Sequence, residues 1–189
     1  MPALETLALP LGFVAPDFAL PDTVSEQILS LDELKGEIAT VVMFICNHCP
    51  YVIHVNPEIV RLANDYIPQG ISFIAISSND TDRYPADSPE NMRLRALELE
   101  YPFPYLYDET QQTAKDYHAV CTPDFSIFDN QLKCVYRGRL DGSKPGNQIP
   151  SNGEDVRNAL DALINGTKIA EKQYPSIGCS IKWREEIPY

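Results

Sequence analysis

The segment FICNHCPY, residues 44–51, places Cys46 and Cys49 three positions apart between an apolar run and a proline. The preceding residues, IATVVMFI (38–45), are continuous and rich in β-branched side chains, which predicts a strand buried on both faces of a parallel or mixed sheet. The residues PYVIHVNPEIVRLANDY (50–66) have a helical pattern, and Pro50 suits a first turn because its missing N–H costs nothing there. A cysteine pair between such a strand and helix can be a redox dithiol, half of a metal site or part of the core.

The overall composition excludes several classes of partner. The chain has 189 residues, 44% hydrophobic and 22% charged, which suits one soluble globular domain. Its net charge of -12 would be repelled by nucleic-acid phosphates and anionic lipid surfaces, so we expect neither as a partner. No apolar run approaches the ~18 residues of a membrane span. No basic residue precedes Lys35, so the charged start of a signal peptide is not visible.

The cysteine count favours a reducing compartment. The five cysteines are an odd number and too few for a disulfide scaffold in this length; they are Cys46, Cys49, Cys121, Cys134 and Cys179. We therefore expect a cytoplasmic protein, in which a close cysteine pair is more often catalytic or metal-binding than structural. Tetrahedral zinc normally takes four ligands, often from two C-x-x-C pairs, and the sequence has no second pair. We therefore predict that the pair holds no metal.

The remaining pattern predicts a single α/β domain with a central mixed sheet flanked by helices, with its core at about 15–166 and a tail at 167–189. Ser30 and Glu33 form a capping-box pattern for a short helix, and Pro57 is expected to kink or break the helix after the cysteines. The loop 79–90 is expected to be solvated, and the tail shows no clear period. The other expected elements are a strand pair at 18–20 and 28–31, strands at 71–78 and 103–107, helices at 88–101 and 109–120, an antiparallel pair at 125–129 and 132–140, and a helix at 153–165.

The strand-to-helix turn predicts distinct roles for the two cysteines. A helix N-terminus carries unpaired N–H groups and the positive end of the helix dipole, so we expect the pKa of Cys46 to fall. Cys49 should lie one turn further into the helix and be more buried, so Cys46 is expected to be the exposed nucleophile and Cys49 the resolving thiol. His48 would stabilise the Cys46 thiolate if it is protonated or donates a hydrogen bond; otherwise it points into solvent.

Other residues bear on how the pair would work. Pro123 stands at a strand entrance after Thr122, which makes it a candidate cis proline whose preceding backbone can pair with an extended substrate chain. Cys121 is expected near Cys46, as a small apolar filler or a third active-site thiol. The tail could fold over the site and bring Cys179 near it. The buried group that helps to deprotonate Cys49 is left open among Lys35, Glu37 and Asp65.

The C-x-x-C pair followed by Thr122-Pro123 resembles the thioredoxin superfamily. The lead-in APDFALPD (15–22) and the inserted helix at 88–101 are similar to the branch shared by peroxiredoxins and extracytoplasmic thiol reductases. FICNHCPY and the tail YPSIGCSIKW (174–183) resemble bacterial peroxiredoxin-like redoxins of the alkyl hydroperoxide reductase and thiol-specific antioxidant group. The resemblance implies a thioredoxin-like fold with an N-terminal extension, a catalytic thiol pair, no cofactor, and electrons supplied by another thiol system.

The sequence departs from the peroxiredoxin pattern at the positions that would hold a peroxide. In P-x-x-x-T-x-x-C counted back from Cys46, Met43 stands for the threonine and Ala39 for the proline, while Thr40 should face the other side of the strand. The sequence therefore predicts a thiol–disulfide oxidoreductase acting on protein or small-molecule disulfides. The alternatives are a thiol peroxidase, in which Cys46 becomes a sulfenic acid that Cys49 resolves, and a metal-binding or non-catalytic module on the same fold.

Overall fold

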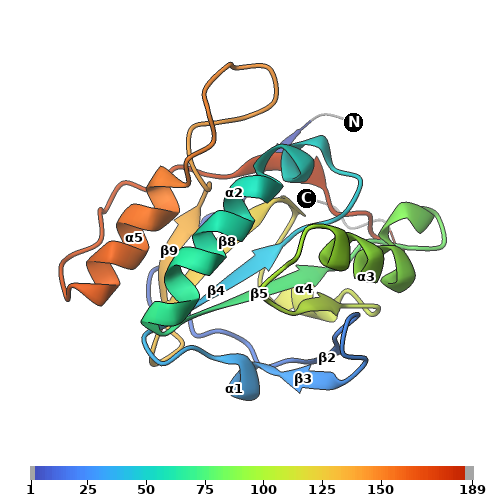
Figure 1. Cartoon of the computed structure of the whole chain (residues 1–189), viewed down its shortest axis with the longest axis horizontal. Coiled ribbons are helices and arrows are strands. Elements are labelled where there is room, and N and C mark those ends of the chain that lie inside the picture. The colour runs from blue at the N-terminus through green and yellow to red at the C-terminus, as the bar shows by residue number, and fades with distance from the viewer. Residues whose placement is uncertain (1–2, 186–189) are drawn as a thin grey trace.

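The computed structural model describes residues 3–185, which are built around a five-stranded mixed sheet (Figure 1). Strand β4 is central and lies parallel to β5 and antiparallel to β8. The edge strands are β6, which pairs with β5, and β9, which pairs with β8. The predicted α/β class with a central mixed sheet is confirmed. Across the sheet the order is β6 (Tyr105–Tyr107), β5 (Ile71–Ser77), β4 (Ala39–Phe44), β8 (Asp124–Asp129) and β9 (Cys134–Gly138).

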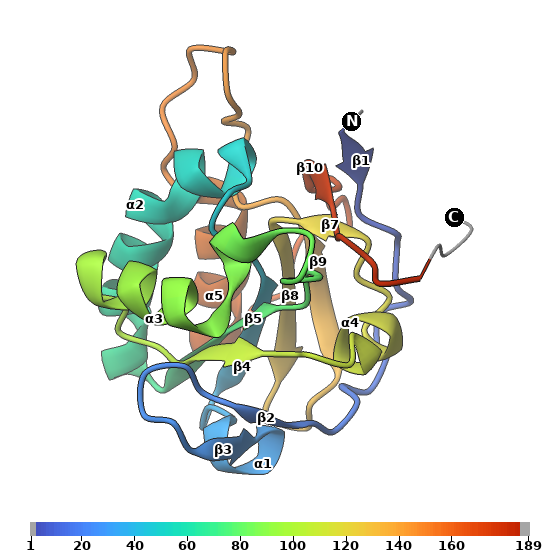
Figure 2. The ribbon, with the colours of Figure 1, turned by 90° about the vertical axis from the view of Figure 1, so that its right-hand side faces the viewer.

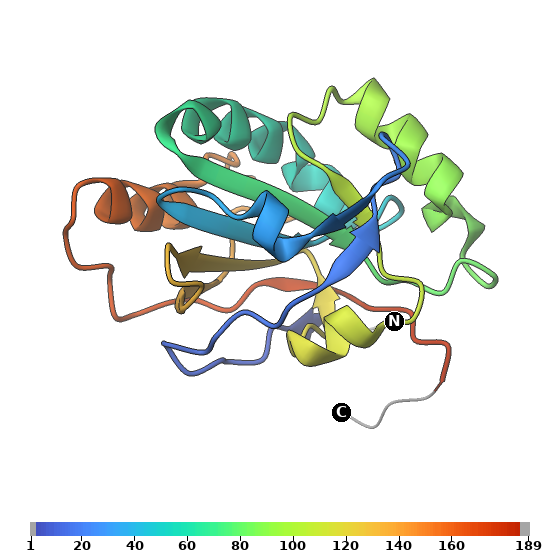
Figure 3. The ribbon, with the colours of Figure 1, turned by 90° about the horizontal axis from the view of Figure 1, so that it is seen from below.

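Helices and terminal segments cover both faces of this sheet, as Figures 2 and 3 show. Every residue of β4 is buried, because alternate side chains enter two hydrophobic clusters, one on each face. Val41 and Met43 belong to the cluster shared with α2 (Pro50–Tyr66), α3 (Pro89–Glu98) and α5 (Glu154–Ile164). Val42 and Phe44 belong to the cluster shared with α4 (Gln112–Asp116) and with residues of both termini.

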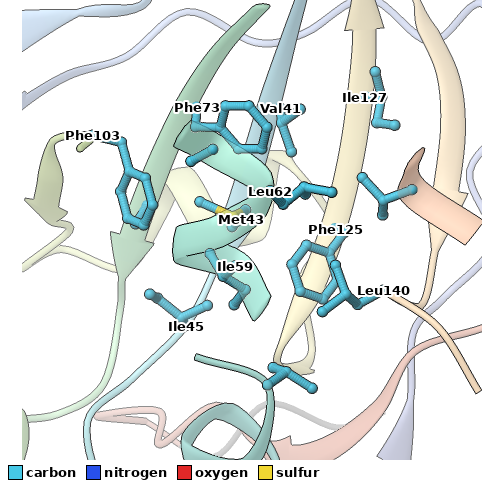
Figure 4. Packing of buried hydrophobic residues seen from close by; sticks show 14 of the residues in the cluster. Val41, Met43, Ile45, Ile59, Leu62, Phe73, Phe103, Phe125, Ile127 and Leu140 are labelled. Carbon is cyan, nitrogen blue, oxygen red and sulfur yellow. The ribbon is translucent and has the colours of Figure 1, made fainter. Parts of the chain in front are cut away.

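Helix α2 continues through Pro57 for 17 residues, so the prediction of a break there is wrong. The proline removes one hydrogen bond and clashes with the preceding turn, at a cost of ~3 kcal/mol or more. Ile59 and Leu62 are fully buried against the sheet, where Figure 4 shows them beside Met43. Because burying one such side chain contributes about 1.5–3 kcal/mol, the apolar face of α2 offsets the loss at Pro57.

The N-terminal segment forms the predicted hairpin and short helix. Strands β2 (Ala19–Pro21) and β3 (Ile28–Ser30) pair antiparallel, and α1 (Leu31–Leu34) follows at once. The capping box is confirmed: Ser30 accepts from the Glu33 backbone N–H, and the Glu33 carboxylate accepts from the Ser30 backbone N–H at 2.9 Å. The 109–120 helix is shorter than predicted, because regular α4 covers only Gln112–Asp116.

A second, smaller sheet contains strands that the sequence pattern did not predict. Its order is β1 (Leu4–Glu5), β10 (Ile177–Ser180) and β7 (Cys121–Thr122), all antiparallel. Figure 2 shows β10 beside β1 and β7, so the tail returns to the body of the protein. Strands of two to four residues are too short to show a hydrophobic period, so periodicity could not predict them. Within residues 3–185, no helix is long and apolar enough to cross a membrane.

Candidate active site

The two cysteines of the C-x-x-C pair lie between the end of β4 and the start of α2. Both side chains are buried, with 2% of Cys46 and 0% of Cys49 exposed, so the expectation of an exposed Cys46 is wrong. Cys49 is the N-cap of α2 and Pro50 is the first helical residue. The helix starts at Pro50, as predicted, and Cys46 lies before it, separated from Cys49 by a bend at Asn47 and His48. The expectation that Cys49 lies one turn inside the helix is wrong, because Cys49 is the N-cap.

Thr122 holds both sulfurs. Its hydroxyl oxygen lies 3.3 Å from Cys46 Sγ, and its carbonyl oxygen accepts a hydrogen bond from the Cys49 thiol at 3.2 Å. The peptide bond from Thr122 to Pro123 is cis, which confirms the prediction for this proline. The residue before the cis proline thus contacts both thiols of the pair.

The electrostatics of the pair differ from the prediction. A hydrogen bond from the Cys46 thiol, supported by Cys179 and by the Val52 backbone N–H, outweighs burial and lowers the pKa of Cys49 to about 4. That same hydrogen bond, together with burial and the charge of Asp87, raises the pKa of Cys46 well above its ordinary value. The predicted fall in the pKa of Cys46 is therefore wrong. The physical reason is that Cys46 donates the hydrogen bond that Cys49 accepts, while burial and the charge of Asp87 also disfavour a Cys46 thiolate.

His48 pairs with a buried carboxylate instead of pointing freely into solvent. Its Nδ1 lies 2.6 Å from Asp87 Oδ2, and its ring stacks on Tyr84 with centroids 5.6 Å apart. The hydrogen bond to Asp87 outweighs partial burial and raises the pKa of His48 above its ordinary value of 6.5. The His48 ring is thus hydrogen-bonded to Asp87, and none of the described hydrogen bonds joins His48 to Cys46.

Asp87 is a site residue that the sequence reasoning missed. It ends the short 3-10 helix η2 (Pro85–Asp87) in the loop that was expected to be solvated, yet its exposed fraction is 0%. Burial raises the pKa of its carboxyl, but hydrogen bonds from His48, Asn79 and the Asn47 backbone N–H outweigh burial and lower it. Loop 79–87 is thereby fastened to the turn between the two cysteines.

The buried carboxylate near the cysteine pair is therefore Asp87. None of the three candidates for a buried proton acceptor that the sequence left open lies in the buried site. Lys35, Glu37 and Asp65 are all exposed. Asp65 forms an ion pair with Arg157 at 2.7 Å on the far part of α2. A possible sequence signal for Asp87 was its position just before the Ser88-Pro89 helix start, but acidic residues are common there for capping reasons alone.

The structure also places the other cysteines. Cys134 is buried in the core, as predicted. Cys121 is buried in β7 next to Thr122, and burial raises the pKa of its thiol. Cys179 is partly exposed in β10, directly opposite Thr122 in the antiparallel register, and its thiol is hydrogen-bonded to Cys49. The tail thus brings Cys179 to the pair.

A buried ion pair supports the strand that follows the cis proline. Arg137 donates to Asp124 Oδ2 at 2.7 Å and to the backbone carbonyls of Tyr117 and His118 at 3.0 and 3.1 Å. Burial raises the pKa of Asp124 to about 6, although Arg137 opposes this. The Arg137 fork therefore ties β8, β9 and the end of α4 together directly behind Pro123.

A groove of about 110 Å³ opens on the other side of Pro123. Its walls come from α2, from the loop that projects above the body in Figure 1 and from the tail; they include Tyr51, Phe125, Ser143, Ser176 and Ile177. His54 of α2 contacts the loop through Ser143 Oγ at 2.6 Å. The backbone of Thr122 is already paired with β10, so the predicted pairing of a substrate chain with that edge does not fit this arrangement. The groove is thus the recess that lies beside Pro123.

Within the described residues, one group of three side chains has its ligand atoms within 4.8 Å of one another: Cys46, His48 and Asp87. Zinc sites need deprotonated ligands in tetrahedral geometry. Here His48 Nδ1 and Asp87 Oδ2 are hydrogen-bonded directly to each other at 2.6 Å, and the Cys46 pKa is raised. These three groups are therefore arranged for one another and fit a metal ion poorly.

Comparisons with known proteins place this arrangement in a family. The chain is 61% identical to an uncharacterized conserved protein from Geobacillus kaustophilus, with a TM-score of 0.97 and 99% of each chain covered. It is 39% identical to a hypothetical protein from Sinorhizobium meliloti 1021, with a TM-score of 0.94, 96% of this chain and 99% of that chain covered. The thioredoxin domain of a thiol-disulfide oxidoreductase from Bacteroides vulgatus is 17% identical, with a TM-score of 0.62 over 81% of this chain and 99% of that domain, which shows the shared fold.

The comparison with curated proteins found no match. The sequence profile described as the AhpC/TSA family matches residues 11–137, about two thirds of the chain. This match includes the C-x-x-C pair, the 79–87 loop and the cis proline, and the structural relatives agree with the predicted thioredoxin-like fold. The chain belongs to the AhpC/TSA family of thioredoxin-fold redoxins.

Proposed function

We propose that this protein is a thiol–disulfide oxidoreductase whose Cys46 and Cys49 cycle between dithiol and disulfide. The observation that carries the proposal is the contact of both sulfurs with each other and with Thr122, beside a cis proline. Two thiols in hydrogen-bonding contact can form a disulfide with little movement of the backbone. Each turnover consumes two electrons, and in this proposal a second thiol system supplies them by disulfide exchange.

Cys46 forms the bond to the partner in this proposal. Its sulfur is surrounded by the groups that can assist a reacting atom, the Thr122 hydroxyl and the His48–Asp87 pair, whereas Cys49 is enclosed by other sulfurs and a carbonyl. The Cys46 proton is shared with the Cys49 sulfur and passes to it as Cys46 attacks the partner disulfide. Cys49 then loses that proton to the departing partner thiolate, attacks Cys46 Sγ and releases the reduced partner.

The resolving step needs the thiolate of Cys49, because only a thiolate attacks a disulfide. The Cys46 thiol that lowers the pKa of Cys49 in the reduced pair is consumed in the mixed disulfide, so the support that remains comes from Cys179 and the Val52 backbone N–H. His48 acts through its charge, because Asp87 keeps the ring positively charged to a higher pH than usual. In this proposal the partner binds in the groove beside Pro123, and Thr122 contacts the two sulfurs. Pro123 and Thr122 thus have separate roles, although the sequence suggested one shared docking role.

The first experiment separates the roles of the two cysteines by trapping. Cys49→Ser is expected to accumulate covalent adducts with a disulfide-bonded test protein such as insulin, released by reductant, because the mixed disulfide at Cys46 is no longer resolved. Cys46→Ser should accumulate none, and Cys134→Ser, in the core, should behave as the wild type. Adducts with Cys46→Ser and none with Cys49→Ser would reverse the roles, and turnover of insulin by neither the wild type nor Cys134→Ser would refute the oxidoreductase.

A thiol peroxidase is the second candidate, supported by one contact. The peroxiredoxin threonine is replaced by Met43, which is fully buried, and Thr40 faces elsewhere and accepts from the Gly36 N–H at 3.0 Å. The Thr122 hydroxyl lies 3.3 Å from Cys46 Sγ and is the contact that supports this candidate, because it places a hydroxyl next to the sulfur although the peroxiredoxin threonine is missing. The raised pKa of Cys46 slows both reactions alike, since a thiol attacks a disulfide or a peroxide as the thiolate, so the replacement of the threonine by Met43 decides the ranking. We therefore rank the disulfide reaction first.

A further inference from the structure

The tail strand β10 occupies the position at the cis proline where an extended partner chain could pair. Cys179 lies opposite Thr122, and Ser180 lies opposite Cys121, in an antiparallel register. Gly178 approaches the Thr122 carbonyl so closely that a side-chain Cβ there would clash with backbone atoms. The Ser176 hydroxyl also donates to the Pro123 carbonyl at 2.6 Å. The strand is thus fitted closely to the two residues that frame the thiol pair.

This docked strand carries a thiol at the position that faces the site. Cys179 lies opposite Thr122, whose carbonyl accepts from the Cys49 thiol at 3.2 Å and whose hydroxyl lies 3.3 Å from Cys46 Sγ. The side chains of Cys46 and Cys179 are also the hydrogen-bond partners that lower the pKa of Cys49. Cys49 therefore lies between two other thiols, one from the turn before α2 and one from the tail. Cys179 is partly exposed, whereas the other two sulfurs are buried. Cys121 lies on the neighbouring strand but is fully buried, and none of the described side-chain hydrogen bonds joins it to the pair.

We propose that Cys179 is a third redox-active thiol, and that β10 is an internal partner that takes the disulfide over from Cys46 and Cys49. This inference rests on the proposed function in one respect, that a Cys46–Cys49 disulfide forms first. The reaction is an internal exchange in which the Cys179 thiolate attacks Cys49 Sγ. The Cys46–Cys49 bond breaks and a Cys49–Cys179 bond forms.

The exchange balances without another reagent. One disulfide is present before and after, so no net oxidation or reduction occurs. Cys179 loses its proton and Cys46, which leaves as a thiolate, takes one up. The raised pKa of Cys46 favours its return to the protonated form. Burial raises the pKa of Cys179 to about 11, so only a small fraction of Cys179 is thiolate at neutral pH and the exchange should accelerate with rising pH.

The transfer has two consequences for the cycle. Cys46 becomes a free thiol again, although the chain remains oxidised. The disulfide now includes the partly exposed Cys179, where an external thiol can attack it more readily than it can attack the buried pair. The tail would thus divide the site into an inner thiol that reacts with the substrate and an outer thiol that receives electrons.

Tryptic peptides distinguish the two disulfides. Cleavage after Lys35 and Arg61 leaves Cys46 and Cys49 together on peptide 36–61, while cleavage after Lys172 and Lys182 leaves Cys179 on peptide 173–182. A Cys46–Cys49 disulfide therefore stays within one peptide. A Cys49–Cys179 disulfide joins the two peptides, and the joined species is absent after reduction.

The decisive measurement uses Cys46→Ser, equilibrated in a glutathione redox buffer, quenched with acid and mapped without reduction. We expect peptides 36–61 and 173–182 to be joined through Cys49 and Cys179, with a loss of two free thiols. The double variant Cys46→Ser/Cys121→Ser should give the same result, and Cys46→Ser/Cys179→Ser should not. Joined peptides would support the inference. Cys49 found only as a free thiol or as a glutathione adduct would overturn it. Cys46→Ala repeats the test if the serine disturbs folding.

The proposed function fails in a different measurement. Cys179→Ser retains Cys46 and Cys49, so the pre-reduced variant should still form the disulfide within peptide 36–61 in a single turnover with insulin. If Cys179→Ser forms that disulfide but Cys46→Ser never joins the two peptides, the third-thiol inference is refuted and the proposed function stands. If Cys179→Ser forms no disulfide in peptide 36–61, the proposed function is refuted as well.

Discussion

Replacing Asp87 with asparagine removes a buried charge and nearly preserves the shape of the side chain. In the wild type, Oδ2 of Asp87 accepts hydrogen bonds from His48 and Asn79 at 2.6 and 2.8 Å, and Oδ1 accepts from the Asn47 N–H at 2.8 Å. Asparagine can accept through one oxygen only, so its amide would meet the donors of His48 and Asn79. Two bonds to a charged acceptor are lost, and at about 1.5 kcal/mol each the free energy of unfolding should fall by about 3 kcal/mol.

The effect should depend on pH in a stated direction. The pKa of His48 is raised in the folded protein, so its stabilisation is fully present below its ordinary pKa of 6.5 and is lost as pH rises through the folded value. The pKa of Asp87 is lowered, so its stabilisation is present above its ordinary pKa of 3.8 and is lost as pH falls through the folded value. The difference between wild type and Asp87→Asn should therefore be largest between these two values, near pH 5–6, and smaller above pH 8.

Urea unfolding followed by Trp183 fluorescence or circular dichroism tests this reasoning. With a denaturant slope of about 2 kcal/mol/M, a loss of about 3 kcal/mol moves the midpoint down by about 1.5 M at pH 6. Asp32→Asn is the matched control, because Asp32 is exposed and its ion pair with Lys35 contributes ~0–1 kcal/mol. A shift for Asp87→Asn no larger than that of Asp32→Asn, or a larger shift at pH 8.5 than at pH 6, would refute the argument.

Three further substitutions, and the rate of reaction with hydrogen peroxide, provide tests of other parts of the site. Stopped-flow mixing with hydrogen peroxide should show thiol loss at the rate of an ordinary thiol; a rate many orders higher would make the protein a peroxidase. Thr122→Val should raise the pKa of Cys46, since the hydroxyl lowers it, and an unchanged pH profile of alkylation would contradict this. Gly178→Ala should displace β10 and expose the thiols to a bulky reagent, which unchanged labelling would disprove. Arg137→Met should lower the free energy of unfolding by about 3–5 kcal/mol by leaving Asp124 unpaired, as urea unfolding would reveal; a loss below about 1 kcal/mol would count against the pair.

The exposed fractions of the thiols bear on how the site operates. Cys46 and Cys49 are both nearly inaccessible in this arrangement, although a disulfide partner has to reach one of them. The segments that cover them, β10 and loop 79–87, are held by contacts made largely through backbone atoms, Asp87 and Gly178.

The sequence by itself determined the features that depend on local pattern. The continuous apolar run before Cys46 could only be a strand buried on both faces, and the Ser30–Glu33 box and the Ser88 cap mark helix starts by hydrogen bonds between neighbours in the chain. The cysteine pair and the proline after Thr122 could be identified because their chemistry lies in the residue types and their spacing.

Tertiary structure decided which groups surround the two sulfurs and where the negative charge lies. Asp87 is distant from His48 in sequence and sits in a polar loop, so its burial depends on the hydrogen bonds that fasten this loop to Asn47. Cys179 lies in a strand of four residues whose pairing with β7 has no periodic signature. The start of α2 at Pro50 was visible in the sequence, but the contacts of Cys46 and Cys49 with Thr122 depend on the folded chain. A pKa depends on contacts over a few ångströms, and those contacts are made by segments that only the folded chain brings together.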